Sequence, residues 1–547
     1  MVNSILSVKA NNSNIPVSIS QENCVIAAID IGTNSIHMVA VKVDLTLPAF
    51  TIIAKEKDTV RLGNRDPKTG NLTPDGIKRA LATLKRCQDL AESLQAIKVI
   101  AVATSAVREA PNGQDFINEV KEKLGLAINL ISGQEEARRI YLGVLSGMEF
   151  DNRPHAIIDI GGGSTELILG DGHAANFLTS VKIGAVRLSQ KLVKNDPLTD
   201  QDFLYLQAYI QGRLERPITE LLDVDLAGEE LKLVGTSGTI EALATIHAKD
   251  KLGYTPDPLN GYSFSRKDLE ELVEDLAKKD YKKRLEVSGM QEKRAEIIVP
   301  GAMILLEAMK MLQVKSIRIC ERALREGVIV DWMLTHKLIE NRLRYQSEIR
   351  ERSVIKIARK YQVDLSYAER VANLALSIFD QTQNVLHEWT EEERELLWAA
   401  AMLHNCGLYV SHSSHHKHSY YLIRNGELLG YTEMELEAIA NLARYYRKSK
   451  PKKKHQPYND FLNDKYRLIV SQISPMLRLA TALDRRKIGA VSQVKCEYNS
   501  KKKELLLSIT PTYAEDDCSS ELWSVEDKKV VFEEEYGIKI ASTINDA

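Results

Sequence analysis

The chain has 547 residues, of which 44% are hydrophobic and 27% are charged, and its net charge is −2. This composition is typical of a folded globular protein, and at roughly 150 residues a domain the length predicts about three to four domains. No apolar run approaches the roughly 20 residues that span a membrane, and the near-neutral charge requires any polyanion to bind a local basic surface. We therefore exclude a membrane partner and expect no nucleic acid as partner.

The cysteines and the first 21 residues bear on location. Six cysteines are scattered without a C-x-x-C pair, which predicts neither a disulfide framework nor a zinc site and is typical of a reducing compartment. Residues 1–21 are rich in Asn and Ser and lack a basic segment followed by an apolar one. They are therefore predicted to be a disordered leader rather than a signal peptide, and the expected location is the cytoplasm.

One pattern of strand, tight turn and strand occurs twice. Residues 25–43 are apolar and β-branched except at the centre, Asp30-Ile-Gly-Thr-Asn-Ser35, and residues 156–169 repeat the design around Asp159-Ile-Gly-Gly-Gly-Ser164. Aligned on the aspartates at an offset of 129, the two centres share four of six residues. Turn preferences explain this agreement poorly, so the repeat predicts two duplicated domains.

Helical and strand signals alternate in each half, which indicates α/β architecture. Thr73 and Pro74 are typical of an N-cap followed by proline at the first helical position, and they predict a helix to about residue 94. A strand is predicted at 98–103. The segment Ser132-Gly-Gln-Glu135 fits a capping box and places Glu136 in the first turn of the next helix.

The two glycine-containing turns predict phosphate binding. Glycine lets backbone N–H groups approach a phosphate, and Ser and Thr hydroxyls add further donors. An aspartate just before such a turn would repel phosphate unless a divalent cation bridges the two. Neither turn is a P-loop, because no Gly-Lys-Ser/Thr follows. A further candidate is LVGTSGTI (233–240), where a strand runs into glycine and hydroxyl residues and then a helix.

After about residue 334 the pattern becomes helical. Amphipathic segments occupy 348–361, 365–379, 390–403, 432–447 and 465–483. From about residue 492 short alternating stretches return, at 504–509, 528–533 and 538–540. The predicted domains are a leader (1–21), two α/β domains (22–145 and 146–334), a helical domain (335–490) and a small α/β domain (491–547).

Seven motifs occur in the order AAIDIGTNSIHMV (27–39), ATSAVREAPN (103–112), ISGQEEARRIYLGV (131–144), IIDIGGGSTEL (157–167), GTSGTI (235–240), VPGAMIL (299–305) and ALREGV (323–328). In this order they resemble the exopolyphosphatase / guanosine pentaphosphate phosphohydrolase family. The resemblance implies an α/β fold of two duplicated actin-like (ribonuclease H-like) ATPase-superfold domains. Residues 398–423 and 444–448 resemble the long bacterial members, which implies a C-terminal HD-like domain.

The resemblance implies roles for individual residues. Glu136 matches the glutamate that orients or deprotonates the attacking water, and Arg108 the arginine that holds the transferring phosphoryl group. Asp30 and Asp159 match the magnesium-associated aspartates, and Asp159 is also counted as catalytic. From position alone, Glu136 would be an exposed helix-start carboxylate and Arg108 a surface ion pair. The implied cofactor is Mg²⁺, with K⁺ as a second candidate. The implied phosphate loops comprise Gly32, Thr33, Asn34, Ser35, Gly161, Gly162, Gly163, Ser164, Thr165, Ser237, Gly238 and Thr239.

The helical domain resembles an HD-type phosphohydrolase domain whose metal ligands have been replaced. Tyr367 stands at the first histidine position, the His-Asp pair is His404-Asn405, and Asp484 alone is in a suitable place. Asn lacks the carboxylate charge, and Tyr is a poor ligand for the divalent metals expected. We therefore predict neither a metal nor a second active site here.

Histidines and basic residues gather in the same domain. A zinc site is disfavoured, because the histidine spacing is unclear and no cysteine supports it. Basic residues at 444–454 and 485–487 suit a polyanion with one charge per phosphate, although a lysine run is more often a solvated loop. The residues predicted to line a polyphosphate channel are His415, His418, Arg447 and Lys448.

These features predict an exopolyphosphatase that removes terminal phosphates processively from inorganic polyphosphate and releases orthophosphate. Hydrolysis of guanosine pentaphosphate to the tetraphosphate stays open, because the phosphate loops do not separate the two substrates. A non-catalytic polyphosphate- or nucleotide-binding regulator is a third interpretation, and a sugar kinase or chaperone-type ATPase would need an adenosine pocket. The resemblance also implies a homodimer.

Overall fold

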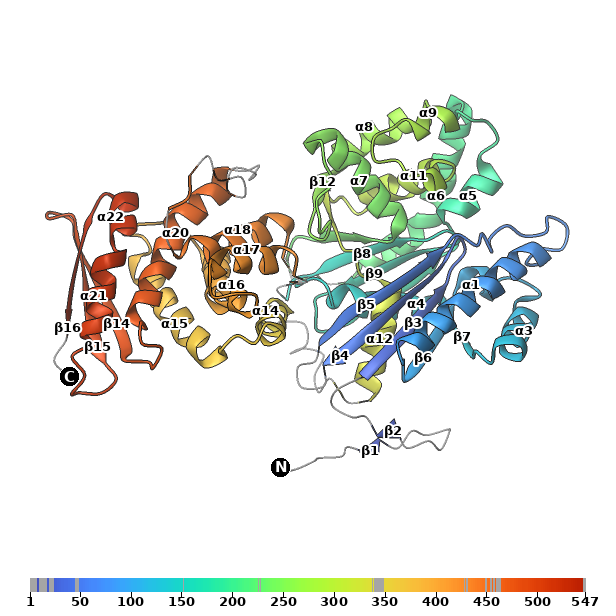
Figure 1. Cartoon of the computed structure of the whole chain (residues 1–547). Helices are drawn as coiled ribbons and strands as arrows, with labels where there is room; N and C mark the ends of the chain where they lie inside the picture. Colours follow the sequence, from blue (N-terminus) through green and yellow to red (C-terminus); the bar gives the residue numbers. More distant parts are fainter. Residues whose placement is uncertain are drawn as a thin grey trace. The chain divides into compact units, whose positions relative to one another are not determined.

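The computed structural model divides into two units, Met1–Ile349 and Arg350–Ala547 (Figure 1). Within the predicted leader, β1 (Ser7–Val8) and β2 (Val17–Ser18) pair antiparallel, so part of it forms a short ladder. None of the described helices is long and apolar enough to cross a membrane. The structure describes residues 24–44, 49–150, 152–224, 226, 228–336, 338, 349–426, 428, 431–447, 450–452, 455, 458 and 464–544, with the backbone of 7–8 and 17–18.

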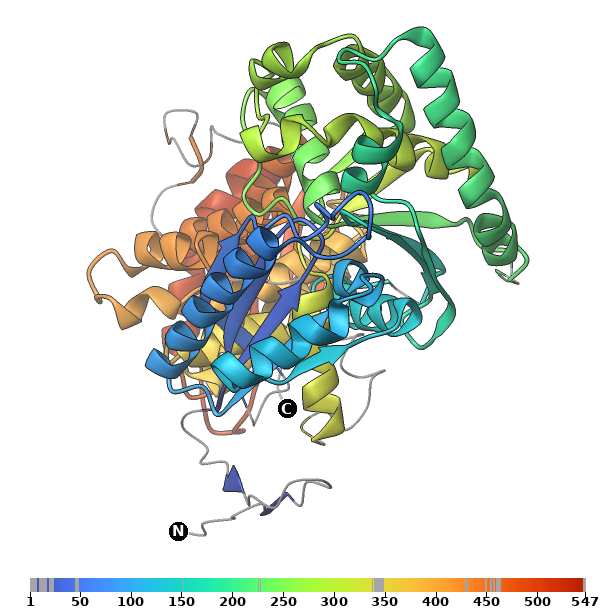
Figure 2. The same ribbon diagram turned by 90° about the vertical axis from the view of Figure 1, so that its right-hand side faces the viewer.

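The first unit contains two sheets with matching strand order. The first sheet runs β5-β4-β3-β6-β7 and the second β10-β9-β8-β11-β13-β12 (Figures 1 and 2). In each, an antiparallel meander of three strands is followed by two parallel strands, which is the actin-like arrangement implied by the sequence, and β12 adds an antiparallel edge strand to the second sheet. The strands are β3 (Cys24–Ile31), β4 (Ile36–Asp44), β5 (Ala49–Asp58), β6 (Lys98–Ala103), β7 (Ile128–Leu130), β8 (His155–Ile160), β9 (Thr165–Gly170), β10 (Ala175–Val181), β11 (Lys232–Thr236), β12 (Ser263–Ser265) and β13 (Ser316–Ile319).

Alternation along the strands sends both aspartates toward one shared layer. On β3, Ile26 and Ala28 join a core with α4 (Gly133–Leu145) and α12 (Leu324–Thr335), and on β8 Ile157 joins the same core. Successive side chains on a strand point to opposite faces. Asp30 and Asp159 therefore lie on the faces of their sheets that meet α4 and α12.

Most local predictions for the first unit are confirmed. Thr73 caps α1 (Pro74–Ser93) by accepting a hydrogen bond from the Gly76 amide, and β6 occupies the predicted residues. The capping box before α4 is only half formed. Ser132 accepts from the Glu135 amide, but the Glu135 carboxylate pairs with Arg138 and Arg139 instead of bonding back to residue 132. Two nearby guanidinium groups attract that carboxylate more strongly than one neutral N–H.

The second unit is a helical bundle with a small sheet, as predicted. One stretch differs: residues 528–533, which alternate like a strand, belong to helices α21 (Ser519–Lys528) and α22 (Val530–Tyr536). Here Phe532 is buried and its ring packs at a tilt against that of Tyr536 one turn later, so tertiary burial overrides a short ambiguous pattern. The remaining elements are α14 (Ile349–Lys360), α15 (Leu365–Thr382), α16 (Glu391–Leu403), η1 (Cys406–Tyr409), α17 (His415–Arg424), α18 (Glu433–Tyr445), α20 (Asp464–Leu483), β14 (Val491–Asn499), β15 (Glu504–Pro511) and β16 (Lys539–Ile544).

Helices α4 and α12 cross in backbone contact at two glycines. A Cβ on Gly143 would lie 1.8 Å from the Ala323 carbonyl oxygen, and one on Gly327 would lie 1.7 Å from the Arg139 carbonyl oxygen. No side chain fits at either position. The crossing therefore fixes the first turn of α4 relative to that of α12, and so positions Glu136 near Arg325.

We expect Gly143→Ala to destabilise the protein, although alanine favours helix more than glycine does. The inserted methyl group meets backbone, so overpacking should cost roughly 1–3 kcal/mol or more. Gly212→Ala in α6 (Asp200–Leu222) is the matched control, because its Cβ would meet nothing within 4 Å. Thermal unfolding should show a lower midpoint for the first variant and an equal or higher one for the control; equal midpoints for Gly143→Ala and the parent would contradict the crossing.

Candidate active site

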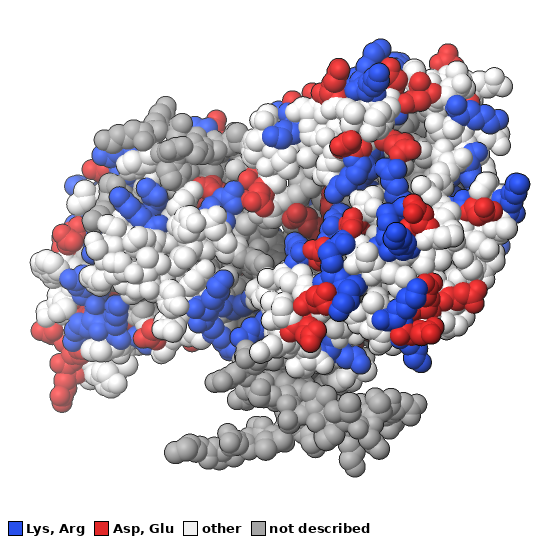
Figure 3. Space-filling model, turned by 45° about the vertical axis from the view of Figure 1, so that its right-hand side comes forward, with Lys and Arg blue, Asp and Glu red and all other residues white. Residues whose placement is uncertain are grey.

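A cleft of about 140 Å³ opens where the turns after β3 and β8 meet. Figure 3 shows positive and negative side chains interspersed over the visible surface, so the charge of the cleft is set locally. The lining includes most of the predicted phosphate-loop residues, together with groups that the sequence did not single out. The loop residues that line it are Gly32, Thr33, Asn34, Ser35, Gly161, Gly162, Gly163, Ser164, Ser237 and Gly238.

The two turns have the same backbone design and touch each other. Gly32 N–H donates to the Ser35 carbonyl at 3.1 Å, as Gly161 N–H does to that of Ser164 at 3.0 Å. A Cβ on Gly163 would lie 2.7 Å from the Thr33 hydroxyl oxygen. The second turn needs glycine because the side chain of the first turn already occupies the space.

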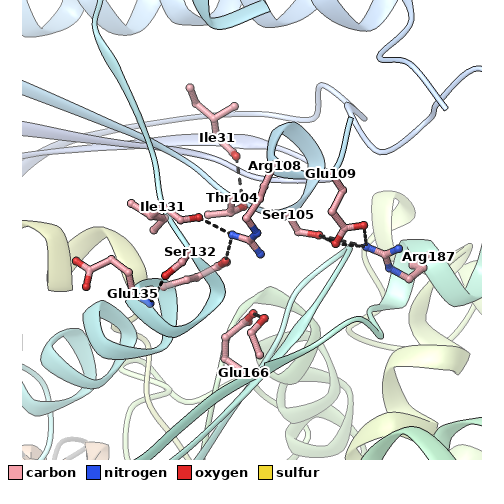
Figure 4. Close-up of polar contacts among 12 residues, drawn as sticks. Ile31, Thr104, Ser105, Arg108, Glu109, Ile131, Ser132, Glu135, Glu166 and Arg187 are labelled. Carbon is pink, nitrogen blue, oxygen red and sulfur yellow. Dashed lines mark hydrogen bonds and ion pairs between the residues drawn. The ribbon is translucent and has the colours of Figure 1, made fainter. Parts of the chain in front are cut away.

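Arg187 ties the second turn to the first half of the duplication. Its guanidinium donates to the Gly163 carbonyl at 2.6 Å and to both carboxylate oxygens of Glu109, at 2.9 and 2.8 Å (Figure 4). Glu109 follows α2 (Ser105–Arg108), so one side chain spans both halves. A two-pronged charged contact of this kind fixes geometry as well as adding energy.

Five carboxylates converge on the cleft. Asp30 and Asp159 come from the ends of β3 and β8, Glu166 from β9, Glu136 from the first turn of α4 and Glu241 from that of α7 (Gly238–Leu252). The β8–β9 register sets Glu166 directly opposite Asp159. With so many like charges in an enclosed space, ionisation of each carboxyl opposes that of its neighbours.

The pKa values record this crowding. Burial raises the pKa of Asp30 to about 6, with Arg325 opposing, and burial raises the pKa of Glu166 to about 7. The pKa of Asp159 is raised well above its ordinary value by burial and then by the Glu166 and Asp30 charges. The cleft therefore contains too little positive charge to balance its carboxylates.

A divalent cation would supply that charge. The Oδ1 atom of Asp30 is buried without a hydrogen-bond partner, and carboxylate oxygens are the ligands that Mg²⁺ prefers. Among the described residues no three acidic or histidine side chains are close enough to enclose a metal by themselves. This fits Mg²⁺, which proteins commonly hold through one or two carboxylates together with substrate phosphates.

Glu136 is buried rather than exposed at its helix start, with 6% of its surface accessible. Arg108 donates to its carboxylate at 3.1 Å and to the Ile131 carbonyl at 2.8 Å (Figure 4). Burial and then the Glu166 charge raise the pKa of Glu136 well above its usual range, while Arg108 lowers it. A carboxylate with a raised pKa is a stronger proton acceptor, as general-base chemistry requires.

Arg108 contacts the Glu136 carboxylate and is not among the residues that line the cleft. The groups that line the cleft as cations are Lys57 on β5, Arg294 on α10 (Glu292–Ala295) and Arg325 on α12. Burial and then Lys293 and Arg294 lower the pKa of Lys57 to about 8. The sequence did not single these cations out, since each comes from a different element and only the fold brings them together.

His37 is a further residue that the sequence analysis missed. It stands 129 positions before Glu166, the same offset as the two aspartates, so a longer alignment of the repeat would have found it. Its Nε2 lies 2.8 Å from the Ser35 hydroxyl oxygen and its Nδ1 3.3 Å from Arg325. Burial and then Arg325 lower the pKa of His37 to about 2, so the imidazole is neutral and orients Ser35.

Two predicted phosphate ligands lie elsewhere. The Thr165 hydroxyl donates to the Ile183 carbonyl at 2.9 Å, because its position in β9 points it away from Glu166 and into the core. Thr239 is buried in the first turn of α7 and does not line the cleft. Ser237 does line the cleft, and its hydroxyl donates a hydrogen bond to the Ile160 carbonyl. Its backbone has φ +85°, a strained conformation of the kind found most often at functional sites.

The second unit gathers the residues of the HD-like pattern. The rings of Tyr367 and His404 lie 5.6 Å apart, and Tyr446 donates to the Asn405 side-chain oxygen. Asp484 accepts from Arg370 at 2.8 Å, so a guanidinium group neutralises the carboxylate that remains. The absence of a metal there stays a prediction.

The predicted channel residues also belong to the second unit. Arg447 lies 3.1 Å from His415 Nδ1, and His418 is half-buried on α17, while Lys448 lies outside the described residues. His415 Nε2 contacts the Tyr446 hydroxyl. Their role in substrate binding stays a prediction.

Comparison with known proteins agrees with this geometry. Residues 38–336 match the Ppx/GppA phosphatase family, and residues 349–529 match Ppx/GppA phosphatase, domain III. A guanosine-5'-triphosphate,3'-diphosphate pyrophosphatase of Vibrio parahaemolyticus is 32% identical over 77% of this chain and 80% of its own length. One from Vibrio cholerae is 29% identical over 88% and 91%.

A solved structure has the same fold. It is an exopolyphosphatase from Cytophaga hutchinsonii, 26% identical with a TM-score of 0.52, covering 58% of this chain and 99% of its own. Fold and cleft thus define a hydrolase that acts on phosphoric anhydrides. The chain belongs to the Ppx/GppA phosphatase family.

The raised carboxyl pKa values predict how Mg²⁺ and pH act on stability. Folded Asp30 and Glu166 keep protons up to about pH 6 and 7. The unfolded chain releases them near pH 4, so the metal-free protein should lose stability as the pH rises from about 4 to about 7. Mg²⁺ should then raise the thermal midpoint at about pH 8 and have little effect at about pH 5, where protons compete. An equal Mg²⁺ shift at both pH values would contradict this.

Proposed function

We propose that this enzyme removes terminal phosphates processively from inorganic polyphosphate, with Mg²⁺ as cofactor. The observation that supports this choice of substrate is a cluster of basic side chains in the second unit. Burial, and then Arg485 and Arg478, lower the pKa of Lys528 to about 8. Arg447 also lowers the pKa of Lys528, whereas the Asp527 carboxylate raises it. Such a cluster of cations favours a polyanion, and polyphosphate carries one negative charge per phosphate along its length.

The cleft suggests how the residues divide the reaction. Asp30 and Asp159 would hold Mg²⁺, which neutralises phosphate charge when bound. Backbone N–H groups of the two turns and the Ser35 and Ser164 hydroxyls would hold the terminal phosphoryl group. Glu136 would accept a proton from a water molecule while the oxygen of that water attacks the terminal phosphorus. The bridging P–O bond breaks, and orthophosphate leaves the shortened chain.

Arg108 has two consistent roles in this scheme. Its pairing with Glu136 orients the carboxylate and opposes the rise in pKa that burial causes. Its guanidinium could also hold the transferring phosphoryl group, as the family resemblance implies. A homodimer and a K⁺ requirement remain predictions.

Guanosine pentaphosphate is the second candidate substrate. The observation that favours it is the 32% identity with a Vibrio parahaemolyticus protein named for that activity. Both substrates end in a phosphoric anhydride, so the turns and Glu136 would serve either one. A nucleotide, however, would not need a cationic surface in another unit.

We expect Glu136→Gln to lower kcat for phosphate release by roughly 10²–10⁴-fold, the usual contribution of a general base, while polyphosphate still binds. Glu135→Gln is the matched control, because this neighbouring carboxylate binds Arg138 and Arg139 instead of lining the cleft. Single-turnover phosphate release and a binding titration measure the two effects. Turnover that survives in Glu136→Gln would remove this residue from the mechanism.

We expect Arg447→Gln to lower kcat/KM for long polyphosphate about tenfold and to flatten its salt dependence, since one phosphate contact is lost. Hydrolysis of tripolyphosphate and of guanosine pentaphosphate should be unchanged. Lys502→Gln, an exposed lysine in the β14–β15 turn, is the control. If the parent enzyme hydrolyses guanosine pentaphosphate and leaves long polyphosphate intact, the second candidate function holds instead.

A further inference from the structure

A second cavity, of about 240 Å³, lies wholly within the second unit. It is bounded by the turn between α14 and α15, by η1 and by the turn that follows α20. The proposed hydrolysis does not use it, and of its lining only Lys487 belongs to the basic stretches that suit a polyanion. Its polar lining comprises Tyr361, Gln362, Asp364, Tyr367, Asn405, Tyr409 and Lys487.

Two aromatic rings form one wall. The ring centroids of Tyr361 and Tyr409 lie 5.6 Å apart at 59°, and 57% of the Tyr409 surface is exposed. An exposed tyrosine beside a cavity presents an open face on which a planar ring can stack. Inorganic polyphosphate has no such ring and would gain nothing from this wall.

Groups beside the rings can hydrogen-bond the edge of a planar ligand. Asp364 uses Oδ1 to cap α15, accepting from the Tyr367 amide at 3.1 Å, which leaves Oδ2 for a ligand donor. Gln362 adds an amide that can donate or accept. Asn405 is held by the Tyr446 hydroxyl at 3.1 Å, so its amide is oriented in advance.

A single cation completes the cavity. The Lys487 ammonium lies 4.9 Å from the Tyr367 ring centroid, and it forms no ion pair among the described residues. The Arg370 guanidinium donates to the Lys487 carbonyl at 2.9 Å and so fixes this residue. The backbone of Lys487 is left-handed, with φ +58°. Gln362, across the same cavity, is also left-handed, at φ +51°. Two strained non-glycine residues at one cavity suggest a binding function.

We propose that this cavity binds a purine nucleotide, with the base stacked on Tyr409, its edge on Asp364 and Gln362, and a phosphate on Lys487. The open aromatic ring, the edge groups and the single ammonium are complementary to a base and a phosphate carried by one ligand. A metal does not suit the cavity, since its described lining offers one carboxylate, Asp364, beside phenols, amides and an ammonium. The inference does not depend on which substrate the cleft hydrolyses.

The test uses the full chain carrying Glu136→Gln, so that the cleft cannot turn substrate over, with excess tripolyphosphate and Mg²⁺ to occupy the cleft. Calorimetric titration with GDP, and with ADP in parallel, should show one site. Tyr409→Ala and Lys487→Gln should each weaken it at least tenfold. Tyr421→Ala, which removes a tyrosine that is 65% exposed in the same unit but outside the cavity, should leave it unchanged.

Several results would overturn the proposal. They are GDP and ADP both failing to bind, GDP binding equally to the Tyr409 and Lys487 variants, and pyrophosphate or guanosine binding as tightly as GDP. Phosphate release by the Tyr409→Ala enzyme with an intact Glu136 should equal that of the parent. Because both variants are surface substitutions, unchanged thermal midpoints will separate lost binding from lost folding.

Discussion

The site depends on one constraint: buried carboxylates are crowded together where two backbone turns touch. The turns approach until Thr33 fills the space over Gly163, and Arg187 bridges them to Glu109. Held this closely, the acids at the ends of β3 and β8 cannot spread apart or reach water freely. Their pKa values therefore rise, and a cation or protons must balance them.

The duplication has diverged where chemistry requires it. Positions 37 and 166 are equivalent in the repeat, yet one is a neutral imidazole that orients Ser35 and the other a carboxylate facing Asp159. Glu136, the proposed base, comes from a third element, α4, which the Gly143–Gly327 crossing holds in place. The two similar halves thus contribute the turns proposed to hold phosphate, while the proposed base comes from outside the repeated turns.

The second unit brings the residues of the predicted HD-like pattern together and pairs them with protein groups. Arg370 donates to the Asp484 carboxylate, and the Tyr446 hydroxyl donates to the Asn405 side-chain oxygen. A cavity remains beside them, with aromatic and amide walls. Cations elsewhere in the unit are crowded enough to lower the pKa of Lys528.

The sequence by itself determined the repeat, the strand–turn–strand units, most helix starts and the family, because capping, alternation and glycine turns are local properties. Asp30, Asp159 and Glu136, which the sequence singled out, line the cleft, whereas the sequence could not find Lys57, Arg294 or Arg325, which are far apart along the chain. Only the tertiary structure decided that Glu136 is buried and that Thr165 points into the core. The reason is that the exposure and the pKa of a side chain depend on the groups that pack against it. Those groups come from distant parts of the chain, so the local sequence does not reveal them.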